Sequence, residues 1–387
     1  MKLLHISDLH LGKRVNEFSM LEDQKYILRQ ILAIADEKQA DGVMIAGDIY
    51  DKPVPSAEAV QVFDWFLTAL AERGKQVFAV SGNHDSAERI AFGAQLMSGR
   101  GVHVSPVYRG DTAKITMTDS YGELCLYLLP FVKPAVVRHA LEGAPGMEET
   151  PMPESYQDAV RLAVERMEVD SSKRNILIAH QFVTGAGRCD SEEVSVGGLD
   201  NVDADVFDAF DYVALGHIHS PQSLKRETVR YCGTPLKYSF SEAAQEKSVT
   251  VVEFREKGNI VLSTAALVPL HDLRKIRGTY LEVTAKSFYQ DTDTDTDDYV
   301  QITLTDEEDI PDGLQKLRII YPNLMRLEYD NSRTRQSRVI ERAEEIEQKS
   351  ELELFAEFYE MQNNQPMSGE QTAFVSRLIE ECRGERE

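Results

Sequence analysis

The segment Ile6-Ser7-Asp8-Leu9-His10-Leu11-Gly12 stands at the end of a short apolar run, residues 3–6. Runs of this length and composition are typical of strands that are buried on both faces of a sheet. Asp8 and His10 would then lie just past the carboxyl end of a strand, which is where ligands collect in open α/β sheets. The segment therefore predicts an α/β fold with a polar site at the strand ends.

The same arrangement recurs along the chain. Apolar runs at residues 43–46, 77–80, 176–179 and 212–215 each precede a short polar motif. The polar residues at the five predicted strand ends are Asp8, His10, Asp48, Asn83, His84, His180, His217 and His219. Each alone has an ordinary explanation, because single histidines are often hydrogen-bonded in cores and Gly-Asp or Gly-Asn pairs are common turns. Their joint occurrence favours one shared site.

The residue types at these positions indicate metal ions. Asp carboxylates, an Asn carbonyl and His imidazoles suit Mn²⁺, Fe²⁺ or Zn²⁺, whereas Cu(I) or a structural zinc ion would recruit thiolates. The set supplies enough ligands for two ions, which at a separation of roughly 3.5–4 Å can hold a phosphate and its attacking oxygen together. The motifs thus predict metal-assisted hydrolysis of phosphoesters.

The motifs D-x-H, G-D, G-N-H-D, H and G-H-x-H, at residues 8–10, 47–48, 82–85, 180 and 216–219, resemble those of the calcineurin-like metallophosphoesterase superfamily. Segments 6–12, 82–89 and 231–239 are similar, more narrowly, to the SbcD family, the nuclease subunits of bacterial SbcCD complexes. The resemblance implies one ion bound by Asp8, His10 and His219, and a second bound by Asn83, His180 and His217. Asp48 would lie between the two ions and bind both.

The resemblance also implies two catalytic residues, His84 and Asp51. His84 would donate a proton to the leaving oxygen or stabilise charge on the phosphate. Related enzymes orient this histidine with a carboxylate, and Asp51 stands at the matching place. A turn role for Asp51, which precedes Lys52 and Pro53, is equally open. Protein serine/threonine phosphatases carry an arginine where this chain has Lys52, and its absence favours a diesterase over a monoesterase.

Composition limits the class of protein. The 387 residues carry a formal net charge of −23 and four cysteines without a C-x-x-C pair. We expect no membrane span, since no stretch approaches 18 apolar residues, and no signal peptide, since Ser7 and Asp8 cut the first apolar stretch short. The scattered cysteines favour a reduced, cytoplasmic protein. The negative charge counts against a free-standing DNA binder, although two divalent ions would add about four positive charges at the site. The basic residues near the motifs either face a substrate or are ordinary surface charges: Arg89, Lys225, Arg226, Arg230 and Lys237.

The order of patterns predicts three parts. Residues 1–270 form a layered metallophosphoesterase core in which sheets are flanked by helices, with helices predicted at 21–38, at 56–73 and, after a connector at 142–153, up to about 169. Residues 271–335 form a small α+β capping domain, with strands at 278–283, 299–304 and 324–329 and a helix at 313–320. The acidic run 291–298 is expected to be a solvated loop. Residues 336–387 form a C-terminal helical hairpin.

The hairpin helices, at 351–362 and 368–382, each carry an apolar face, and Ser368 with Gln371 predicts a capping box. These faces pack either on the chain's own core or, as the resemblance implies, on the coiled coil of an SbcC-type ABC ATPase. The chain has no P-loop of its own, so ATP would belong to that partner. The apolar residues of segment 56–71 suggest a homodimer surface within a heterotetramer: Val60, Phe63, Trp65, Phe66, Leu67 and Leu70.

The patterns predict a phosphoesterase that uses two divalent ions, with Mn²⁺ the expected metal. The resemblance implies that the substrate is DNA and that the enzyme is a double-strand exonuclease and an endonuclease on single strands and hairpins, in double-strand-break repair, recombination and hairpin processing. One alternative is an enzyme of the same superfamily that hydrolyses cyclic nucleotides or nucleotide anhydrides, which would have no use for the apolar tail. The other is a non-catalytic scaffold, which is disfavoured because no ligand position has been replaced.

Overall fold

The computed structural model describes residues 1–142, 151–192, 201–290 and 295–335, together with single residues and short pieces between 352 and 378. The chain divides into two compact units. The first contains Met1–Lys275 and Asp297–Gln301, and the second contains Ile276–Thr296 and Ile302–Glu387. All of the residues predicted to bind metal or to act in catalysis lie in the first unit.

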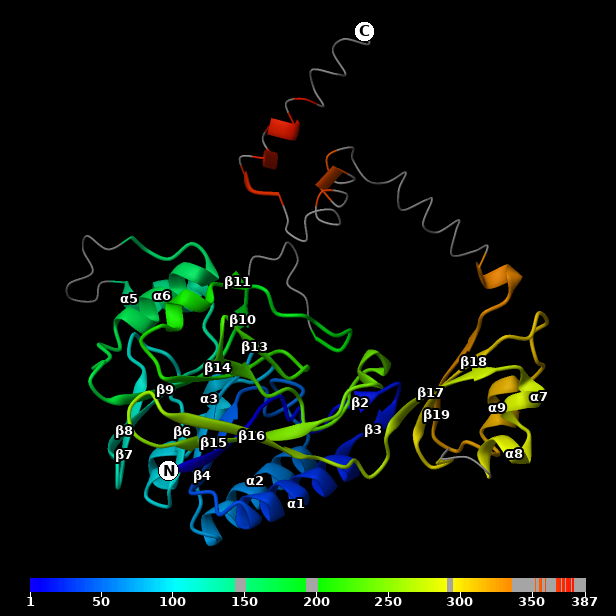
Figure 1. The fold of residues 1–387 in the computed structure, drawn as a ribbon, viewed down its shortest axis with the longest axis horizontal. Coiled ribbons are helices and arrows are strands. Elements are labelled where there is room, and N and C mark those ends of the chain that lie inside the picture. Colours follow the sequence, from blue (N-terminus) through cyan, green and yellow to red (C-terminus); the bar gives the residue numbers. More distant parts are fainter. Residues whose placement is uncertain are drawn as a thin grey trace. The chain divides into compact units, whose positions relative to one another are not determined.

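Two six-stranded sheets form the described part of the first unit (Figure 1). The first sheet has four adjacent parallel strands, and two antiparallel strands extend it on one side. In spatial order its strands are β16 (Ile260–Ala266), β15 (Ser248–Phe254), β1 (Lys2–Ile6), β4 (Gly42–Ala46), β5 (Gln76–Val80) and β6 (Val102–Val104). The predicted apolar runs at 3–6, 43–46 and 77–80 all lie within these strands.

The second sheet also has four parallel strands in the middle, with an antiparallel strand at each edge. In spatial order its strands are β13 (Gln222–Leu224), β14 (Arg226–Tyr231), β12 (Tyr212–Gly216), β9 (Arg174–His180), β8 (Gly122–Leu129) and β7 (Ala113–Asp119). The runs at 176–179 and 212–215 form parts of β9 and β12. Two short ladders pair β2 (Arg14–Val15) with β3 (Phe18–Ser19) and β10 (Phe182–Val183) with β11 (Asn201–Val202).

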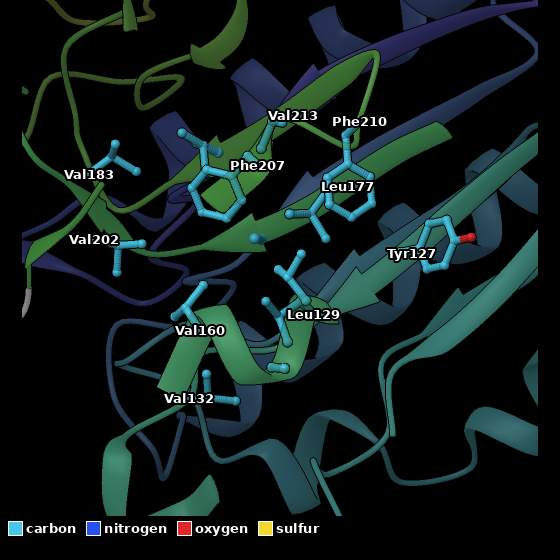
Figure 2. Packing of buried hydrophobic residues seen from close by; sticks show 14 of the residues in the cluster. Tyr127, Leu129, Val132, Val160, Leu177, Val183, Val202, Phe207, Phe210 and Val213 are labelled. Atoms are coloured by element: carbon cyan, nitrogen blue, oxygen red, sulfur yellow. The ribbon is translucent and has the colours of Figure 1, made fainter. Parts of the chain in front are cut away.

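The two large sheets share an apolar core, to which Phe78 and Met44 contribute from one sheet and Ile178 from the other. Successive side chains of a strand point to opposite faces, so Leu128 of β8 faces this core while Tyr127 faces a second one. The second core lies between the second sheet and a layer of helices (Figure 2). This layer contains α5 (Pro134–Leu141), α6 (Tyr156–Glu165) and the 3₁₀ helix η1 (Ala204–Phe207).

Two longer helices, α1 (Leu21–Glu37) and α2 (Ala57–Glu72), lie on the other side of the unit (Figure 1). They pack on one another, and α2 packs on β5. The N-terminus of α2 is capped by Ser56, whose hydroxyl accepts a hydrogen bond from the amide of Ala59 at 3.2 Å. Two short helices, α3 (Ala87–Ile90) and α4 (Ala94–Ser98), follow β5. The first unit is therefore the layered α/β core that the sequence predicts.

The apolar residues of α2 divide between the core and the surface. Phe63, Phe66, Leu67 and Leu70 are buried in this chain, so they are not available to a second copy. Val60 and Trp65 are exposed, and the guanidinium of Arg29 lies 5.9 Å from the Trp65 ring centre. The predicted dimer surface is thus smaller than the sequence suggests.

A three-stranded sheet contains β17 (Leu273–Gly278), β18 (Tyr299–Leu304) and β19 (Leu324–Tyr329). The second unit includes the C-terminal halves of β17 and β18, all of β19, and helices α7 (Tyr280–Val283), α8 (Lys286–Tyr289) and α9 (Gly313–Leu317). The strands at 299–304 and 324–329 are confirmed, but the strand at 278–283 is wrong. A capping box starts α7 instead, because the Thr279 hydroxyl accepts from the amide of Glu282 and the Glu282 carboxylate accepts from the amide of Thr279.

Three other expectations need correction or fall outside the described residues. The helix expected to reach residue 169 ends at Glu165. Asp298 of the acidic run is buried rather than solvated, because its carboxylate accepts from the side chain of Arg274 and the amide of Asp272. Residues 143–150 and 291–294 and most of 336–387 are outside the description, apart from helical pieces between 352 and 378.

The capping box at the second tail helix is confirmed, since Ser368 and Gln371 exchange hydrogen bonds of 2.8 and 3.3 Å. Among the described residues, Cys125, Cys189 and Cys232 are free thiols. None of the helices in the described ranges combines the length and the apolar composition that a membrane crossing requires.

Candidate metal centre

The predicted site residues lie at the carboxyl ends of parallel strands from both sheets. In the first sheet, β1 leads to Asp8 and His10, β4 leads to Asp48, and β5 leads to Asn83 and His84. In the second sheet, His180 ends β9, and β12 leads to His217 and His219. Five segments that are distant in the sequence therefore meet at the point where the two sheets face one another.

Main-chain hydrogen bonds hold the loops of the first sheet together. The amide of Asp8 donates to the carbonyl of Gly47 at 3.0 Å, and the amide of His10 donates to the carbonyl of Asp48 at 2.9 Å. The amide of His84 donates to the Asp48 carboxylate at 2.9 Å. These bonds fix the spacing of the three loops before any ligand arrives.

Asp85 connects two of these loops through its carboxylate. It accepts hydrogen bonds from the amides of Ile49, Tyr50 and Gly82 at distances of 3.0, 2.9 and 2.9 Å. Burial, and then the neighbouring charge of Asp48, raise the pKa of Asp85 to about 6. Our sequence reasoning gave Asp85 no role, although its place in the G-N-H-D motif was a signal that it belongs to the site.

Two motif glycines allow the sheets to approach closely. A Cβ atom at Gly216 would collide with the carbonyl oxygen of Ala46, and one at Gly47 would collide with the ring of His180. Gly47 also has a φ of +85°, which other residues rarely adopt. The same seam is bridged by the His180 Nδ1–H, which donates to the carbonyl of Ala46 at 2.8 Å.

Several of the predicted ligands have unusual backbone conformations. Asp8, His10, Asp48 and His217 have φ values of 54°, 43°, 48° and 103°. Positive φ is uncommon for residues with a side chain and is retained where the surrounding structure holds it, often at functional sites. The strain therefore coincides with the positions that the motifs identify.

Asp8, His10 and His219 form what we call the first half-site. One ligand atom from each lies within 4.8 Å of the others, and the Nε2 atoms of the two histidines are 3.2 Å apart. Burial lowers the pKa of His10 well below its usual value, and the nearby Asp48 does not offset this. Burial raises the pKa of Asp8. The His10 ring is therefore neutral at pH 7, as a metal ligand must be.

Asn83, His180 and His217 form the second half-site. The side-chain oxygen of Asn83 lies 2.9 Å from His180 Nε2 and 3.0 Å from His217 Nδ1. Burial, and then the charge of His180, lower the pKa of His217 to about 3. Burial also acts to lower the pKa of His180, but the Asp48 carboxylate outweighs it and raises the value to about 9.

The Asp48 carboxylate faces both half-sites with one oxygen. Its Oδ2 lies 3.7 Å from His10 Nε2 in the first half-site and 3.4 Å from His180 Nε2 in the second. Burial would raise the pKa of Asp48, but the charges of His180, His10 and His84 outweigh burial and lower it. Asp48 is therefore ionised, and its Oδ2 lies between ligands of the two half-sites.

His84 and Asp51 are neighbours, but not in the way expected. The His84 Nδ1–H donates to the main-chain carbonyl of Asp51 at 3.0 Å, and His84 Nε2 lies 3.9 Å from Asp48 Oδ2. The Asp51 carboxylate instead accepts from the Lys13 ammonium at 2.8 Å and lies 3.6 Å from His10 Nδ1. Lys13 and His10 draw the carboxylate away, so the main chain holds His84.

The donor atoms fit divalent ions of intermediate hardness. The two half-sites and Asp48 offer carboxylate, amide and imidazole donors. Cys232 lies close by, but its sulfur is 3.1 Å from the Ser7 hydroxyl and does not belong to either half-site. The Nε2 of His217 is buried and has no hydrogen-bond partner among the described residues. A site for Mn²⁺, Fe²⁺ or Zn²⁺ is consistent with this set.

Most of the basic residues that the sequence analysis named near the motifs pair with other parts of the protein. Lys225 pairs with Asp205, and Arg226 donates to the carbonyls of Phe207 and Phe210. Arg230 donates to Thr250, and Lys237 pairs with Asp272. Arg89 is exposed. The first four therefore have structural partners, as ordinary surface charges do.

Two protein families match the chain. Residues 1–221 match the calcineurin-like phosphoesterases. Residues 269–363 match a domain described as the type 5 capsule protein repressor C-terminal domain. A protein of Staphylococcus epidermidis, named as the D subunit of the nuclease SbcCD, is 31% identical in an alignment of 386 residues that covers 98% of this chain and 98% of that protein. The similarity to this relative thus includes both units.

Two solved structures match the chain at lower sequence identity. A protein of Thermus thermophilus has a TM-score of 0.39 and 13% identity, covering 68% of this chain and 98% of its own. A dimetal phosphatase of Danio rerio has a TM-score of 0.43 and 11% identity, covering 69% of this chain and 96% of its own.

Proposed function

This chain belongs to the SbcD family of calcineurin-like phosphoesterases, and we propose that it hydrolyses DNA phosphodiesters with two divalent ions held by the two half-sites. It is the metal-dependent nuclease subunit of an SbcCD-type complex. The finer assignment is an exonuclease on double strands and an endonuclease on single strands and hairpins, acting in DNA repair and recombination. We take the ions to be Mn²⁺ and the compartment to be the cytoplasm.

The position of Asp48 is the observation that carries the proposal. A single carboxylate oxygen lies 3.7 Å from a ligand of the first half-site and 3.4 Å from a ligand of the second. Two divalent ions at such a site lower the pKa of water and stabilise the charge on a phosphate in the transition state. Asp8, His10 and His219 would hold one ion, Asn83, His180 and His217 the other, and Asp48 both.

His84 is placed to handle the proton of the leaving group. Its Nδ1–H is used by the carbonyl of Asp51, so the ring is fixed with Nε2 toward Asp48. Nε2 is then the ring nitrogen that would deliver a proton to the leaving oxygen. In this arrangement Asp51 orients His84 through its main chain.

A DNA substrate suits this site better than a phosphomonoester. Lys52, which occupies the place of the arginine in phosphomonoesterases, is exposed and offers no bidentate grip. A small-molecule substrate is also less favoured, because the full-length similarity extends to the second unit and the tail. Ions held by Asp48 and the half-sites would supply positive charge to a phosphate of the DNA backbone.

The decisive test is Mn²⁺-dependent cleavage of an end-labelled DNA hairpin by the purified chain. We expect cleavage that a chelator abolishes and that His84→Ala lowers by about 10²–10⁴-fold, the usual contribution of a general acid. His139→Ala, which changes an exposed histidine of α5, is the matched control and should cleave normally. A wild-type chain that hydrolyses neither DNA nor a small diester with Mn²⁺ would refute the proposal.

The tail is the proposed docking site for the ABC ATPase. Phe355 and Phe374 are 43% and 57% exposed, and they line a groove of about 340 Å³ with Tyr359 and Val375. An apolar groove on a terminal helical segment suits an amphipathic helix of a coiled coil. Phe355→Ser with Phe374→Ser should abolish co-purification with the ATPase and spare diester hydrolysis, whereas loss of both would indicate that the tail supports the chain's own fold.

The dimer is proposed to form through the exposed residues of α2, Val60 and Trp65, which are 43% and 37% exposed. Two copies of the chain would then accompany two ATPase subunits. Sedimentation of the wild type as a dimer and of Trp65→Ala as a monomer at micromolar concentration is expected. A monomeric wild type would exclude this surface.

A further inference from the structure

A chain of short hydrogen bonds leads from His219 away from the half-sites. The ring nitrogen Nδ1 of His219 lies 2.7 Å from the hydroxyl of Ser191. That hydroxyl donates to the Glu242 carboxylate at 2.6 Å, and the second oxygen of Glu242 accepts from the Lys247 ammonium at 2.6 Å. None of the three supporting residues belongs to a motif that our sequence reasoning identified.

The direction of the hydrogen bonds between His219, Ser191 and Glu242 fixes the tautomer of His219. The Glu242 carboxylate accepts hydrogen bonds from the Lys247 ammonium at 2.6 Å and from the amide of Tyr238 at 3.2 Å. Glu242 is therefore an ionised acceptor, and the single proton of the Ser191 hydroxyl goes to it. The Ser191 oxygen must then accept the hydrogen bond from His219, so Nδ1 carries a proton. The lone pair of Nε2 is left facing His10, 3.2 Å away.

The end of this hydrogen-bond network that lies away from His219 is a buried ion pair of Glu242 and Lys247. Glu242 is fully buried and Lys247 is 5% exposed, so each needs the other as a charge partner. The Lys247 ammonium also donates to the carbonyl of His219 at 3.0 Å and to the hydroxyl of Thr234 at 2.8 Å. The same ammonium thus supports the main chain of His219 directly and its ring through Glu242 and Ser191.

Glu192 holds His219 at a further point, because its carboxylate accepts from the His219 amide at 2.7 Å. The ring, the amide and the carbonyl of His219 are therefore each held by a different partner. A buried ion pair that served stability alone would not require the link through Ser191 to the imidazole. The contact with Nδ1 is what connects the network to the metal centre.

We propose that Ser191 and Glu242 are positioning residues that fix the tautomer and the orientation of His219 as a metal ligand of the first half-site. This inference rests on the proposed metal centre. It assigns the network to one half-site only, so its removal should weaken one of two bound ions. Residues that hydrogen-bond to a ligating histidine typically contribute about 10–100-fold to metal affinity.

The test is Mn²⁺ binding to the full chain, measured by calorimetry and by electron paramagnetic resonance without DNA. We expect the wild type to bind two ions and Ser191→Ala to bind one of them about 10–100-fold more weakly, with the other unchanged. Ser191→Thr retains the hydroxyl and should restore the affinity. Ser98→Ala, which removes an exposed serine hydroxyl that donates to the carbonyl of Gln95, is the matched control.

A second variant tests the far end of the network. Glu242→Gln should weaken the same ion, and Glu246→Gln, which changes an exposed carboxylate of the same loop, should not. Thermal unfolding of each variant shows whether it folds, since Lys247 loses its charge partner in Glu242→Gln. For both network variants, DNA cleavage should fall at limiting Mn²⁺ and recover at saturating Mn²⁺, because only affinity has changed.

The outcomes separate the two proposals. A wild type that binds no Mn²⁺ would refute the metal centre itself. A wild type that binds two ions, with a folded Ser191→Ala that keeps both affinities, would overturn the positioning role and leave the metal centre intact. A loss of cleavage in Ser191→Ala that persists at saturating Mn²⁺ would also overturn it, since positioning of a ligand predicts recovery.

Discussion

The two half-sites have similar ligands but are supported in different ways. In the first half-site, the ring of His219 is held by the side chains of Ser191 and Glu242. In the second, the ring of His180 is held by a main-chain atom, the carbonyl of Ala46 in β4. Side-chain support can be removed by one substitution, whereas the main-chain carbonyl is present whatever residue stands there. The first half-site is therefore the one whose affinity substitutions can adjust, and the second is built into the sheets.

The half-sites also differ in charge. At pH 7 the His180 ring of the second half-site carries a proton, since Asp48 raises its pKa to about 9, while the buried His10 ring of the first does not. An ion can bind His180 only after that proton has left. Substitutions and pH can thus be used to separate the two half-sites experimentally.

The largest effect is expected where the two half-sites are joined. Asp48→Asn removes the ionised oxygen that faces both, so both ions should bind weakly and DNA cleavage should fall at least about a thousandfold. This follows from a loss of several kcal/mol of transition-state stabilisation at about 1.4 kcal/mol for each factor of ten. The measurements are Mn²⁺ stoichiometry and the cleavage rate.

The matched control for this variant is Asp36→Asn, which changes an exposed carboxylate paired with Arg73 on the surface. It should keep both ions and the full rate. If Asp48→Asn lost only one ion and still cleaved DNA with the other, Asp48 would belong to a single half-site and would not join the two.

The second prediction uses pH to distinguish the half-sites. Because His180 is protonated below about pH 9 in the metal-free chain, Mn²⁺ affinity of the second half-site should rise as pH increases from 7 to 9. The release of one proton corresponds to about tenfold per pH unit. Calorimetry in buffers of different ionisation enthalpy would report the proton that is released.

Asn83→Ala provides the comparison for this measurement, since it removes a ligand of the second half-site. The affinity of the first half-site for Mn²⁺ remains measurable in this variant. It should not show the rise between pH 7 and 9 that the His180 proton causes. An equally steep dependence in this variant would show that the proton leaves from the first half-site, where burial also raises the pKa of Asp8.

The smallest effect is expected at Asp51. Its main-chain carbonyl holds His84, and this contact survives Asp51→Asn. The lost charge weakens only the contact with Lys13, which is a ligand of neither half-site. We therefore expect less than about a tenfold change in the cleavage rate, with both ions bound. A loss as large as that of His84→Ala would mean that the carboxylate itself acts on His84 during catalysis.

The sequence allowed prediction of the parts that depend on short-range pattern. The apolar runs before Asp8, Asp48, Asn83, His180 and His217 were strands, because each is too short and too rich in branched residues for a helix. Their convergence followed from the rule that ligands gather at the carboxyl ends of parallel strands. The fold class and the composition of the candidate site were therefore accessible without a structure.

The residues that hold the ligands in place could not be predicted from the sequence. Ser191 and Glu242 are far from His219 in the sequence, and no spacing rule indicates that a serine would lie between a histidine and a carboxylate. The segment 278–283 was misassigned because a capping box, Thr279 with Glu282, outweighed its strand-forming residues. The contact of the Asp51 carboxylate with Lys13, a long-range neighbour, was likewise not visible in the sequence.

The origin of the ligands has a consequence for stability. Each half-site takes ligands from both sheets: His219 joins Asp8 and His10 in the first, and Asn83 joins His180 and His217 in the second. Ions bound here would hold the sheets together at the seam where Gly216 and Gly47 let them approach. By mass action, an ion at a hundred times its dissociation constant stabilises the folded state by about 2.7 kcal/mol. The folded fraction of this nuclease would thus depend on the manganese level around it.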